Sequence, residues 1–238
     1  MSELNIDLHP AQLEIFNSDK RFKIVAAGRR FGKSYLSAWL LLINAIQAES
    51  KDVFYIAPTF QQAKDIMWGM LKELGRDLIS AAHENTAVLT LINGRKIYLK
   101  GSDRPETLRG VGLAYVVLDE YASMKPVVWE QIIRPTLADV RGGALFIGTP
   151  SGKNHFFDLY QDAFEDDDWD AFQYTSVDNP FLPADEVEAA KKTMSSMSFR
   201  QEFEASFETF TGGIFKEEWF KVDEEPDEGS YVIAIDPA

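Results

Sequence analysis

Cysteine is absent from the 238-residue chain, which excludes disulfide bonds, thiolate catalysis and cysteine-ligated zinc sites. Long hydrophobic runs are also absent, since no stretch reaches the roughly 18 consecutive apolar residues that predict a membrane span. The amino-terminal segment Met1-Ser2-Glu3-Leu4-Asn5 lacks the basic and apolar regions of a secretory signal peptide. We therefore expect a soluble intracellular protein with no membrane contact.

Positive charge is scarce, because 24 Lys and Arg residues face 38 Asp and Glu residues and leave a net charge of −14. Such a deficit argues against a nucleic-acid partner, since phosphate backbones are bound largely by Lys and Arg. However, residues 1–150 contain 18 basic and 16 acidic side chains, whereas residues 151–238 contain 6 and 22. The first part of the chain thus stays compatible with an anionic partner. The acidic runs of the last third predict solvated loops or a surface for a basic partner.

Short β-rich runs alternate with helical stretches from residue 22 to about 150, which predicts an α/β fold with a mostly parallel sheet flanked by helices. A hydrophobic content of 45% suits one globular domain with a small appendage. The predicted strands cover residues 22–26, 53–57, 113–119 and 144–149, with an antiparallel hairpin of 87–91 and 96–99 around Asn93-Gly94. The predicted helices cover residues 33–48, a segment from Thr59 through Leu71, a segment opened by Pro126 and interrupted near Pro135, and aromatic-rich segments at 156–164, 183–194 and 199–207.

The segment Ala27-Gly28-Arg29-Arg30-Phe31-Gly32-Lys33-Ser34 joins the first predicted strand to a predicted helix. A loop that binds a triphosphate needs small residues at close backbone approaches, a lysine for the outer phosphates and a hydroxyl for Mg²⁺. Gly32, Lys33 and Ser34 supply these elements. Ala27 stands where the G-x-x-x-x-G-K-[ST] pattern has its first glycine, so the pattern is missed by one methyl group. The segment still predicts an ATP-binding loop, because the helix that follows adds favourable partial charge for an anion.

Two carboxylates, Asp119 and Glu120, follow the apolar run Tyr115-Val116-Val117-Leu118. At the end of a buried strand, Asp119 can reach Mg²⁺, usually through water, and Glu120 can deprotonate an attacking water. A general base of this kind contributes on the order of 10²–10⁴ in rate. The alternative is that the pair only ends a strand and caps a turn. Together with the phosphate-binding loop, the pair predicts ATP hydrolysis.

Other polar residues are candidates for the same site. The amide of Gln12 can pair with the edge of adenine, although it also suits an ordinary surface position. Thr149 ends the strand that follows the carboxylates and can contact the γ-phosphate or form a simple turn. Arg29, Arg30 and Arg109 are candidates for an arginine finger, which contributes roughly 10³–10⁵ in turnover, whereas most arginines are solvated or form surface ion pairs.

In combination, these motifs resemble the large terminase subunits of tailed bacteriophages, the motors that package DNA into empty capsids. The resemblance covers essentially the whole chain. It includes, besides the phosphate-binding loop and the carboxylate pair, the segments Ala57-Pro58-Thr59, Leu108-Arg109-Gly110, Gly148-Thr149-Pro150, Phe199-Arg200-Gln201-Glu202-Phe203 and Gly213-Ile214-Phe215. It implies a RecA-like ATPase domain of the ASCE P-loop class, a small helical lid or linker subdomain, and then a ribonuclease-H-like nuclease domain.

The resemblance also implies roles for individual residues. Arg29 matches an arginine that contacts the γ-phosphate, Gln12 matches a glutamine that faces adenine, and Glu120 matches the catalytic base. The segment of Thr149 matches one that couples hydrolysis to motion. Arg109 matches an arginine finger supplied to the nucleotide of the neighbouring subunit.

The same resemblance divides the chain. It implies an ATPase core at residues 1–152, a lid or linker subdomain at 153–222, an acidic linker at 223–230 and the first strand of the nuclease domain at 231–238. Asp236 then matches the first metal-binding aspartate of the nuclease. Because that domain is incomplete here, we expect nuclease activity only in a longer chain.

The implied function is Mg²⁺-dependent ATP hydrolysis coupled to the translocation of double-stranded DNA into a procapsid. The implied partners are double-stranded DNA, a portal protein and a small terminase subunit. The implied assembly is a homo-oligomeric ring, although the isolated chain can be a monomer. The implied location is the cytoplasm of an infected bacterial host, at the procapsid portal.

Two alternatives remain open from the sequence. A superfamily-two-like helicase also suits Ala57-Pro58-Thr59 and the carboxylate pair, but it needs a second RecA-like domain, for which residues 151–238 are too short. A nucleotide-binding assembly clamp with little turnover suits the phosphate-binding loop, but it has no need of a base at Glu120.

Overall fold

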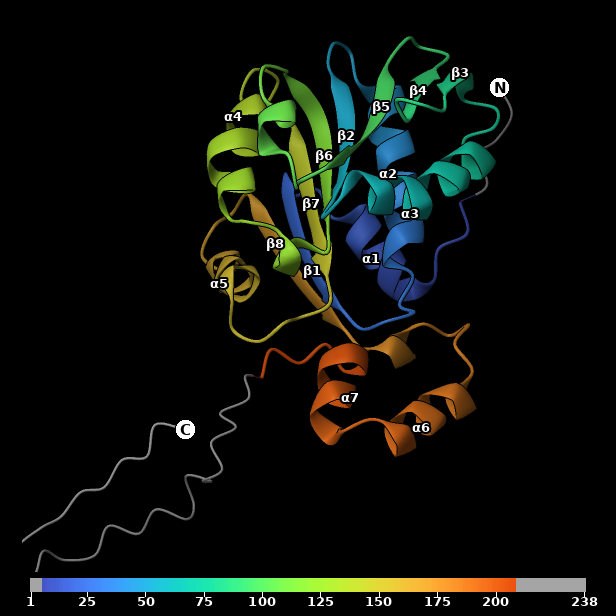
Figure 1. Cartoon of the computed structure of the whole chain (residues 1–238), viewed down its shortest axis with the longest axis vertical. Coiled ribbons are helices and arrows are strands. Elements are labelled where there is room, and N and C mark those ends of the chain that lie inside the picture. Colours follow the sequence, from blue (N-terminus) through green and yellow to red (C-terminus); the bar gives the residue numbers. More distant parts are fainter. Residues whose placement is uncertain (1–5, 209–238) are drawn as a thin grey trace, which may run out of the picture.

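A sheet of eight strands in the order β3-β4-β5-β2-β6-β7-β1-β8 forms the centre of the protein (Figure 1). The computed structural model describes residues 6–208. The strands are β1 (Phe22–Ala27), β2 (Asp52–Ala57), β3 (Ile79–His83), β4 (Val88–Leu91), β5 (Lys96–Gly101), β6 (Leu113–Asp119), β7 (Gly143–Gly148) and β8 (Trp169–Tyr174). The helices are α1 (Pro10–Asn17), α2 (Lys33–Gln47), α3 (Phe60–Leu74), α4 (Arg134–Thr136), α5 (His155–Asp162), α6 (Ala184–Thr193) and α7 (Ser196–Phe203).

Most neighbouring strands are parallel. The parallel pairs run from β5 through β2, β6, β7 and β1 to β8, whereas β3, β4 and β5 pair antiparallel. The prediction of a mostly parallel sheet is confirmed, as is the antiparallel hairpin. In its turn, Leu91 N donates to Arg95 O at 2.8 Å and Gly94 has a φ of 81°.

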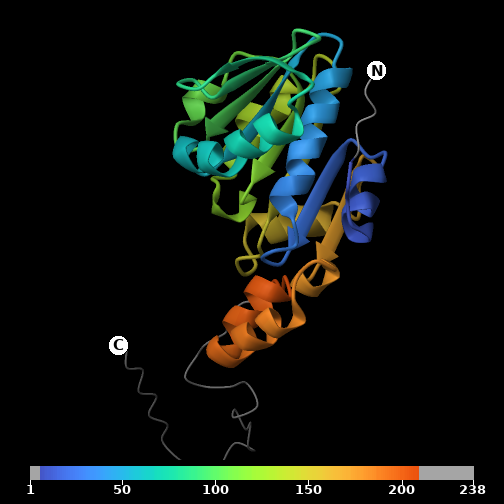
Figure 2. The ribbon, with the colours of Figure 1, turned by 90° about the vertical axis from the view of Figure 1, so that its right-hand side faces the viewer.

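Helices cover both faces of the sheet, with α1, α2 and α3 on one face and α5 on the other (Figures 1 and 2). Successive side chains of β6 point to opposite faces of the sheet. Tyr115 and Val117 pack toward α2, whereas Val116 and Leu118 pack toward α5 and the π-helix Val128–Ile133. Strands that are buried on both faces read as continuous apolar runs. This explains why the central strands could be recognised in the sequence.

The expected boundary between residues 152 and 153 is wrong for the sheet. β8 lies beyond it and pairs in parallel with β1, from Phe22 opposite Trp169 to Ala27 opposite Tyr174. This strand was missed because it is an edge strand of half-buried residues and lacks a continuous apolar run. β3 was missed for a similar reason, since most of its residues are exposed.

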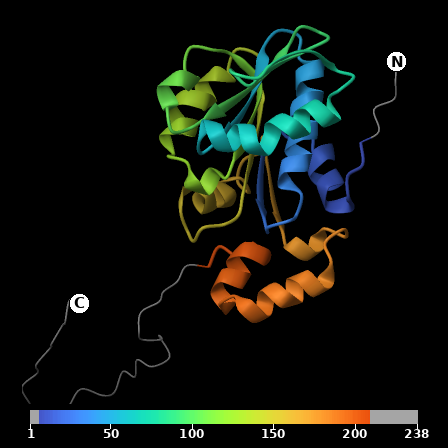
Figure 3. The same cartoon turned by 45° about the vertical axis from the view of Figure 1, so that its right-hand side comes forward.

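The two helices α6 and α7 lie together beyond the end of the sheet at which β1 and β8 finish (Figure 3). The observed α7 begins three positions before the predicted start at residue 199 and ends at Phe203. The predicted interruption near Pro135 corresponds to the change from a π-helix to α4. The predicted acidic linker and terminal strand, with Asp236, lie outside the described residues. Among residues 6–208, none of the helices has the length and apolar character needed to cross a membrane.

Candidate active site

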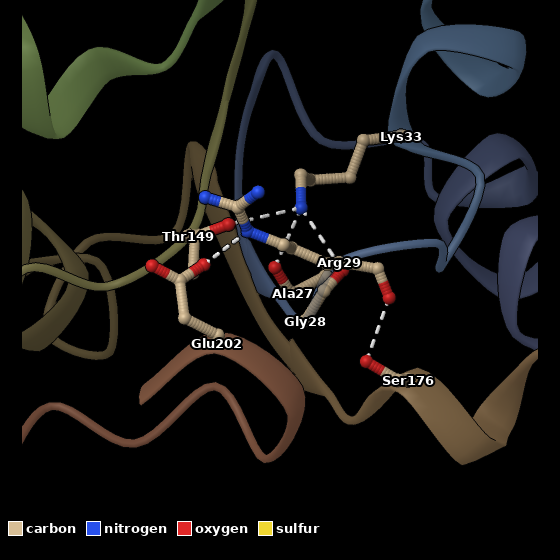
Figure 4. Close-up of polar contacts among 7 residues, drawn as sticks. All are labelled: Ala27, Gly28, Arg29, Lys33, Thr149, Ser176 and Glu202. Atoms are coloured by element: carbon tan, nitrogen blue, oxygen red, sulfur yellow. Dashed lines mark hydrogen bonds and ion pairs between the residues drawn. The ribbon is translucent and has the colours of Figure 1, made fainter. Parts of the chain in front are cut away.

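The loop between β1 and α2 wraps around the ammonium group of Lys33. The Nζ atom donates to Ala27 O at 2.7 Å, to Gly28 O at 3.0 Å and to Thr149 Oγ1 at 3.3 Å (Figure 4). Gly32 has a φ of 98°, a conformation that side chains rarely adopt and that glycine accepts without strain. The loop therefore places a lysine where it can exchange these backbone and hydroxyl oxygens for phosphate oxygens.

A cavity of about 530 Å³ opens beside Lys33. It is lined by Arg29, Arg30, Lys33, Glu120, Ala122, Ser123, Thr149, Pro150, Ser151, Gln201 and Glu202. Four segments that are distant in the sequence meet here, namely the loop after β1, the residues that follow β6, the residues that follow β7, and the end of α7. The structure thus brings together the predicted site residues Arg29, Arg30, Lys33, Glu120 and Thr149 around one cavity.

Asp119 is buried at the end of β6. Its carboxylate accepts hydrogen bonds from the hydroxyl of Tyr55 and from Glu120 N, the latter at 2.9 Å. Burial raises the pKa of Asp119 to about 6, and the hydrogen bond from Tyr55 opposes this rise. Burial also lowers the pKa of Lys33, while the carboxylates of Glu120 and Asp119 raise it. The lysine and the two carboxylates therefore lie close enough to influence one another electrostatically.

Glu120 has a left-handed backbone, with a φ of 52°. Such a conformation costs energy for a residue other than glycine and is frequent at functional sites. The residue is half-buried and lines the cavity of Lys33. Glu120 therefore shares one cavity with Lys33.

Ser34 and Asp119 fit Mg²⁺ only together with a nucleotide. Neither lines the cavity directly, but each is adjacent in sequence to a residue that does, Lys33 or Glu120. Within residues 6–208, no group of three or more His, Asp or Glu side chains is placed to hold a metal ion by itself. Mg²⁺ in nucleotide sites takes one or two carboxylates and completes its shell with phosphates and water. Asp119 supplies a buried carboxylate and Ser34 supplies a hydroxyl, and both are oxygen ligands of the kind that Mg²⁺ takes.

A second cavity, of about 390 Å³, surrounds Gln12. The Nε2 atom of Gln12 donates to Gly32 O at 2.9 Å, and its Oε1 atom accepts from His9 N at 3.2 Å. These bonds fix the orientation of the amide and leave it one N–H and one lone pair for a ligand. The cavity is lined by Asp7, His9, Gln12, Phe31, Gly32, Tyr35, Asn179 and Phe181. It is a suitable place for a purine base.

Phe31 has a structural role within the loop. Its buried ring stacks on Tyr174 at 5.1 Å between centroids, and its carbonyl lies 2.9 Å from His9 Nε2. The ring thus anchors the loop to β8 and α1. Phe31 is one of the predicted ATP-binding residues, and it lines the second cavity instead of the first.

Contacts from the last third of the described chain were not predicted. Glu202 Oε2 lies 2.5 Å from Arg29 Nε, and Ser176 Oγ donates to Arg29 O at 2.6 Å (Figure 4). Asn179 Nδ2 donates to Arg30 O at 2.7 Å. Only Glu202 carried a signal, because it lies in the segment Phe199–Phe203 noted for its family resemblance. Ser176 and Asn179 lie in no motif.

Arg109 does not share the cavity of Lys33. It is exposed and lines a separate cavity of about 440 Å³ with Lys51, Asp139 and neighbouring residues. Its guanidinium therefore lies apart from the phosphate-binding loop of its own chain. Asp236, the predicted metal-binding residue of the nuclease, lies outside the described part of the chain.

A family comparison covers most of the chain. The sequence profile described as "Terminase large subunit, T4likevirus-type, N-terminal" matches residues 24–222. The chain belongs to the large terminase family. A relative, the large terminase subunit of Escherichia phage T5, is 32% identical over 219 residues, which cover 86% of this chain and 49% of that protein. The large terminase of Thermus phage G20c is 29% identical over 64% of this chain and 36% of its own length. This terminase chain thus spans about half the length of the T5 relative.

Solved structures of other terminases have the same fold. The large terminase ATPase domain of Thermus phage P74-26 superimposes with a TM-score of 0.74, at 24% identity over 84% of this chain and 94% of that one. The large terminase of a thermophilic bacteriophage, in complex with ADP, gives a TM-score of 0.73 at 17% identity over 85% of this chain and 54% of that one. The prediction of a RecA-like fold is confirmed.

Proposed function

We propose that this terminase chain is the ATPase domain of a DNA-packaging motor, which couples Mg²⁺-dependent ATP hydrolysis to the translocation of double-stranded DNA into a procapsid. The observation that carries the proposal is the shared cavity of Lys33, Glu120 and Thr149. A phosphate-binding lysine and a candidate base in one cavity suit hydrolysis rather than binding alone. Family membership and the fold of the P74-26 ATPase domain support the same function.

The residues divide the reaction among them. The ammonium of Lys33 exchanges its three oxygen acceptors for oxygens of the β- and γ-phosphates. Ser34 and Asp119 hold Mg²⁺, which neutralises charge on the phosphates when it is bound. Glu120 orients the attacking water and accepts its proton. Arg29 stabilises negative charge on the γ-phosphate. Thr149 loses its hydrogen bond from Lys33 when the ammonium turns to the phosphates, and it thereby responds to the nucleotide.

The adenine base lies in the second cavity. There the remaining N–H and lone pair of Gln12 pair with the base edge, while His9 and Gly32 keep the amide in place. The two cavities share the phosphate-binding loop as a wall, because Gly32 and Lys33 are adjacent. One nucleotide can therefore span the two cavities, with its base in the second cavity and its phosphates in the first.

We infer that the partners are double-stranded DNA, a portal protein, a small terminase subunit and further copies of the chain in a ring. The exposed position of Arg109, away from the cavity of its own chain, supports a ring in which this residue serves a neighbour. The proposed place of action is the procapsid portal in the cytoplasm of an infected bacterium.

Steady-state phosphate release with and without double-stranded DNA tests the proposed function. We expect release that requires Mg²⁺ and rises with DNA, and slow release from monomers, which lack a neighbour's arginine. Tight ATP binding with negligible release under all conditions would support the assembly clamp instead. Strand separation would support a helicase, although residues 6–208 contain a single RecA-like sheet.

The proposed role of Arg109 predicts complementation between inactive variants. We expect the Arg109→Ala and Glu120→Gln proteins to be nearly inactive alone and to regain part of the activity when mixed. In a mixed ring, some interfaces combine an intact Glu120 with an intact Arg109 from the neighbour. The measurement is ATP turnover as a function of mixing ratio.

The control for mixing is a titration with a protein that carries both substitutions, which cannot complement either variant. Mixed assemblies are verified by differently labelled subunits that co-elute. If mixed rings form and turnover stays at the level of the separate variants, Arg109 does not act on a neighbouring site.

A further inference from the structure

Tyr55 places a hydroxyl inside the apolar core of the sheet. The residue lies on β2, is fully buried, and packs in the hydrophobic cluster between the sheet and α2. A buried hydroxyl destabilises the fold unless it forms a hydrogen bond. This hydroxyl donates to the carboxylate of Asp119, at the end of the neighbouring strand β6. The polar end of a core residue thus meets the carboxylate that we propose for Mg²⁺.

The register of the two strands explains how these side chains meet. Tyr55 lies opposite Val117, so Asp119 lies two positions further along β6. Successive side chains of a strand alternate between the faces of the sheet, and Val117 packs on the face of α2. Asp119 therefore belongs to the same face, where α2 begins with Lys33 and Ser34. Tyr55 thus shares its face of the sheet with both proposed metal ligands.

Tyr55 approaches Asp119 from the side away from the phosphate-binding loop. The strand order β2-β6-β7-β1 places β2 on one side of β6, and the loop follows β1 on the other side (Figure 1). Asp119 Oδ2 accepts from Tyr55, and Asp119 Oδ1 accepts from Glu120 N at 2.9 Å. Each carboxylate oxygen can take more than one partner. The two hydrogen bonds therefore fix the orientation of the carboxylate and still leave lone pairs for a metal or its water.

We propose that Tyr55 is a positioning residue for the metal, because its hydroxyl holds the carboxylate of Asp119 in the orientation in which this group takes Mg²⁺ or a water of Mg²⁺. Groups that orient metal ligands raise metal affinity without touching the metal, and their loss weakens it about 10- to 100-fold. The inference rests on the proposed function, since Mg²⁺ enters this site with a nucleotide. It gives β2 a part in the site, although no residue of β2 lines the cavity of Lys33.

The test is the effect of Mg²⁺ on the affinity of the Tyr55→Phe protein for the slowly hydrolysed analogue ATP-γ-S. Phenylalanine keeps the ring and removes only the hydroxyl. Calorimetry gives the dissociation constants in EDTA and in saturating Mg²⁺, and their ratio is the metal-dependent gain in affinity. We expect this gain to fall roughly threefold to tenfold, at or below the lower end of the range for such groups, because the bond from Glu120 N remains. Loss of packing alone would weaken binding in both conditions alike and leave the gain unchanged.

The matched control is Tyr115→Phe. Tyr115 is a buried tyrosine of the same hydrophobic cluster, near the other end of β6 from Asp119. Within residues 6–208 its hydroxyl has no hydrogen-bond partner, so the substitution removes the same atom without touching Asp119. We expect a metal-dependent gain within about twofold of the wild type, as for sites that do not interact. In an Asp119→Asn background, Tyr55→Phe should leave the gain unchanged, because the carboxylate that it positions is absent.

The outcomes separate the two claims. If the wild type does not bind ATP-γ-S, or binds it equally well in EDTA and in Mg²⁺, the proposed metal–nucleotide site fails and takes this inference with it. If Mg²⁺ strengthens binding to the wild type and the gain persists in the Tyr55→Phe protein, the role of Tyr55 is wrong while the ATP site stands. If Tyr55→Phe does not fold, a crystal structure of the wild type with Mg²⁺ and ATP-γ-S decides instead. Tyr55 must then donate to Asp119 while Asp119 contacts the metal or its water, and the absence of either contact overturns the inference.

Discussion

Replacement of Glu120 by glutamine is expected to reduce steady-state ATP turnover by a factor on the order of 10²–10⁴ and to leave ATP binding intact. The residue lines the cavity of Lys33, directly after the carboxyl end of β6. An amide has the shape of the carboxylate but cannot accept the proton of the attacking water. Glutamine meets the same left-handed backbone as glutamate, so the strain at a φ of 52° is common to both proteins.

Phosphate release and calorimetric ATP binding measure the two halves of this expectation. Glu73→Gln is the matched control, because Glu73 is exposed on α3 and does not line the cavity of Lys33. We expect its turnover to equal that of the wild type. Near-normal hydrolysis by the Glu120→Gln protein would mean that another group accepts the proton, with Glu202 the next carboxylate to test.

The central strands and the phosphate-binding loop could be predicted because their signals are local. β1, β2, β6 and β7 are almost wholly buried, so their sequences are nearly continuous apolar runs. The loop and the carboxylate pair add short patterns with a fixed chemical meaning. Their convergence on one cavity follows from the parallel sheet, since all four strands end at the same edge.

The contacts that α7 and the residues after β8 make with the phosphate-binding loop could not be predicted, because they join distant segments. Arg29 and Glu202 are 173 positions apart in the sequence, and Ser176 lies 147 positions from Arg29. Such contacts depend on how α7 and the end of β8 dock onto the loop, and no residue pattern within either segment encodes this docking. β8 itself was hidden by its half-buried edge position, which placed the expected core boundary too early.

The sequence predicted a role for Arg109 but did not predict its position relative to the cavity of Lys33. Its sequence neighbourhood singled it out as a candidate finger, and the structure separates it from the cavity of its own chain. A residue that acts on a neighbouring copy does not need to lie in the cavity of its own chain. The separation of Arg109 from the cavity of its own chain is compatible with the trans role, and the mixing experiment is the direct test.

Replacement of Lys33 by alanine is expected to weaken ATP binding at least roughly 100-fold, about 3 kcal/mol, and to abolish turnover with it. Among the described residues, the ammonium is the one lysine group that lines the cavity, and its burial concentrates its charge on the few oxygens it meets. Hydrogen bonds to charged groups contribute about 1.5–3 kcal/mol each, and a triphosphate offers several acceptors. Alanine supplies neither the charge nor a donor.

Loss of the lysine also removes the donor to Ala27 O and Gly28 O, so we expect the loop to loosen in the absence of nucleotide. Thermal melting of the free protein separates this effect from lost binding, with Lys72→Ala, an exposed lysine of α3, as the control. A folded Lys33→Ala protein that binds ATP within a few-fold of the wild type would place the phosphates elsewhere. Glu120 would then have no substrate beside it, and hydrolysis at this cavity would have to be abandoned.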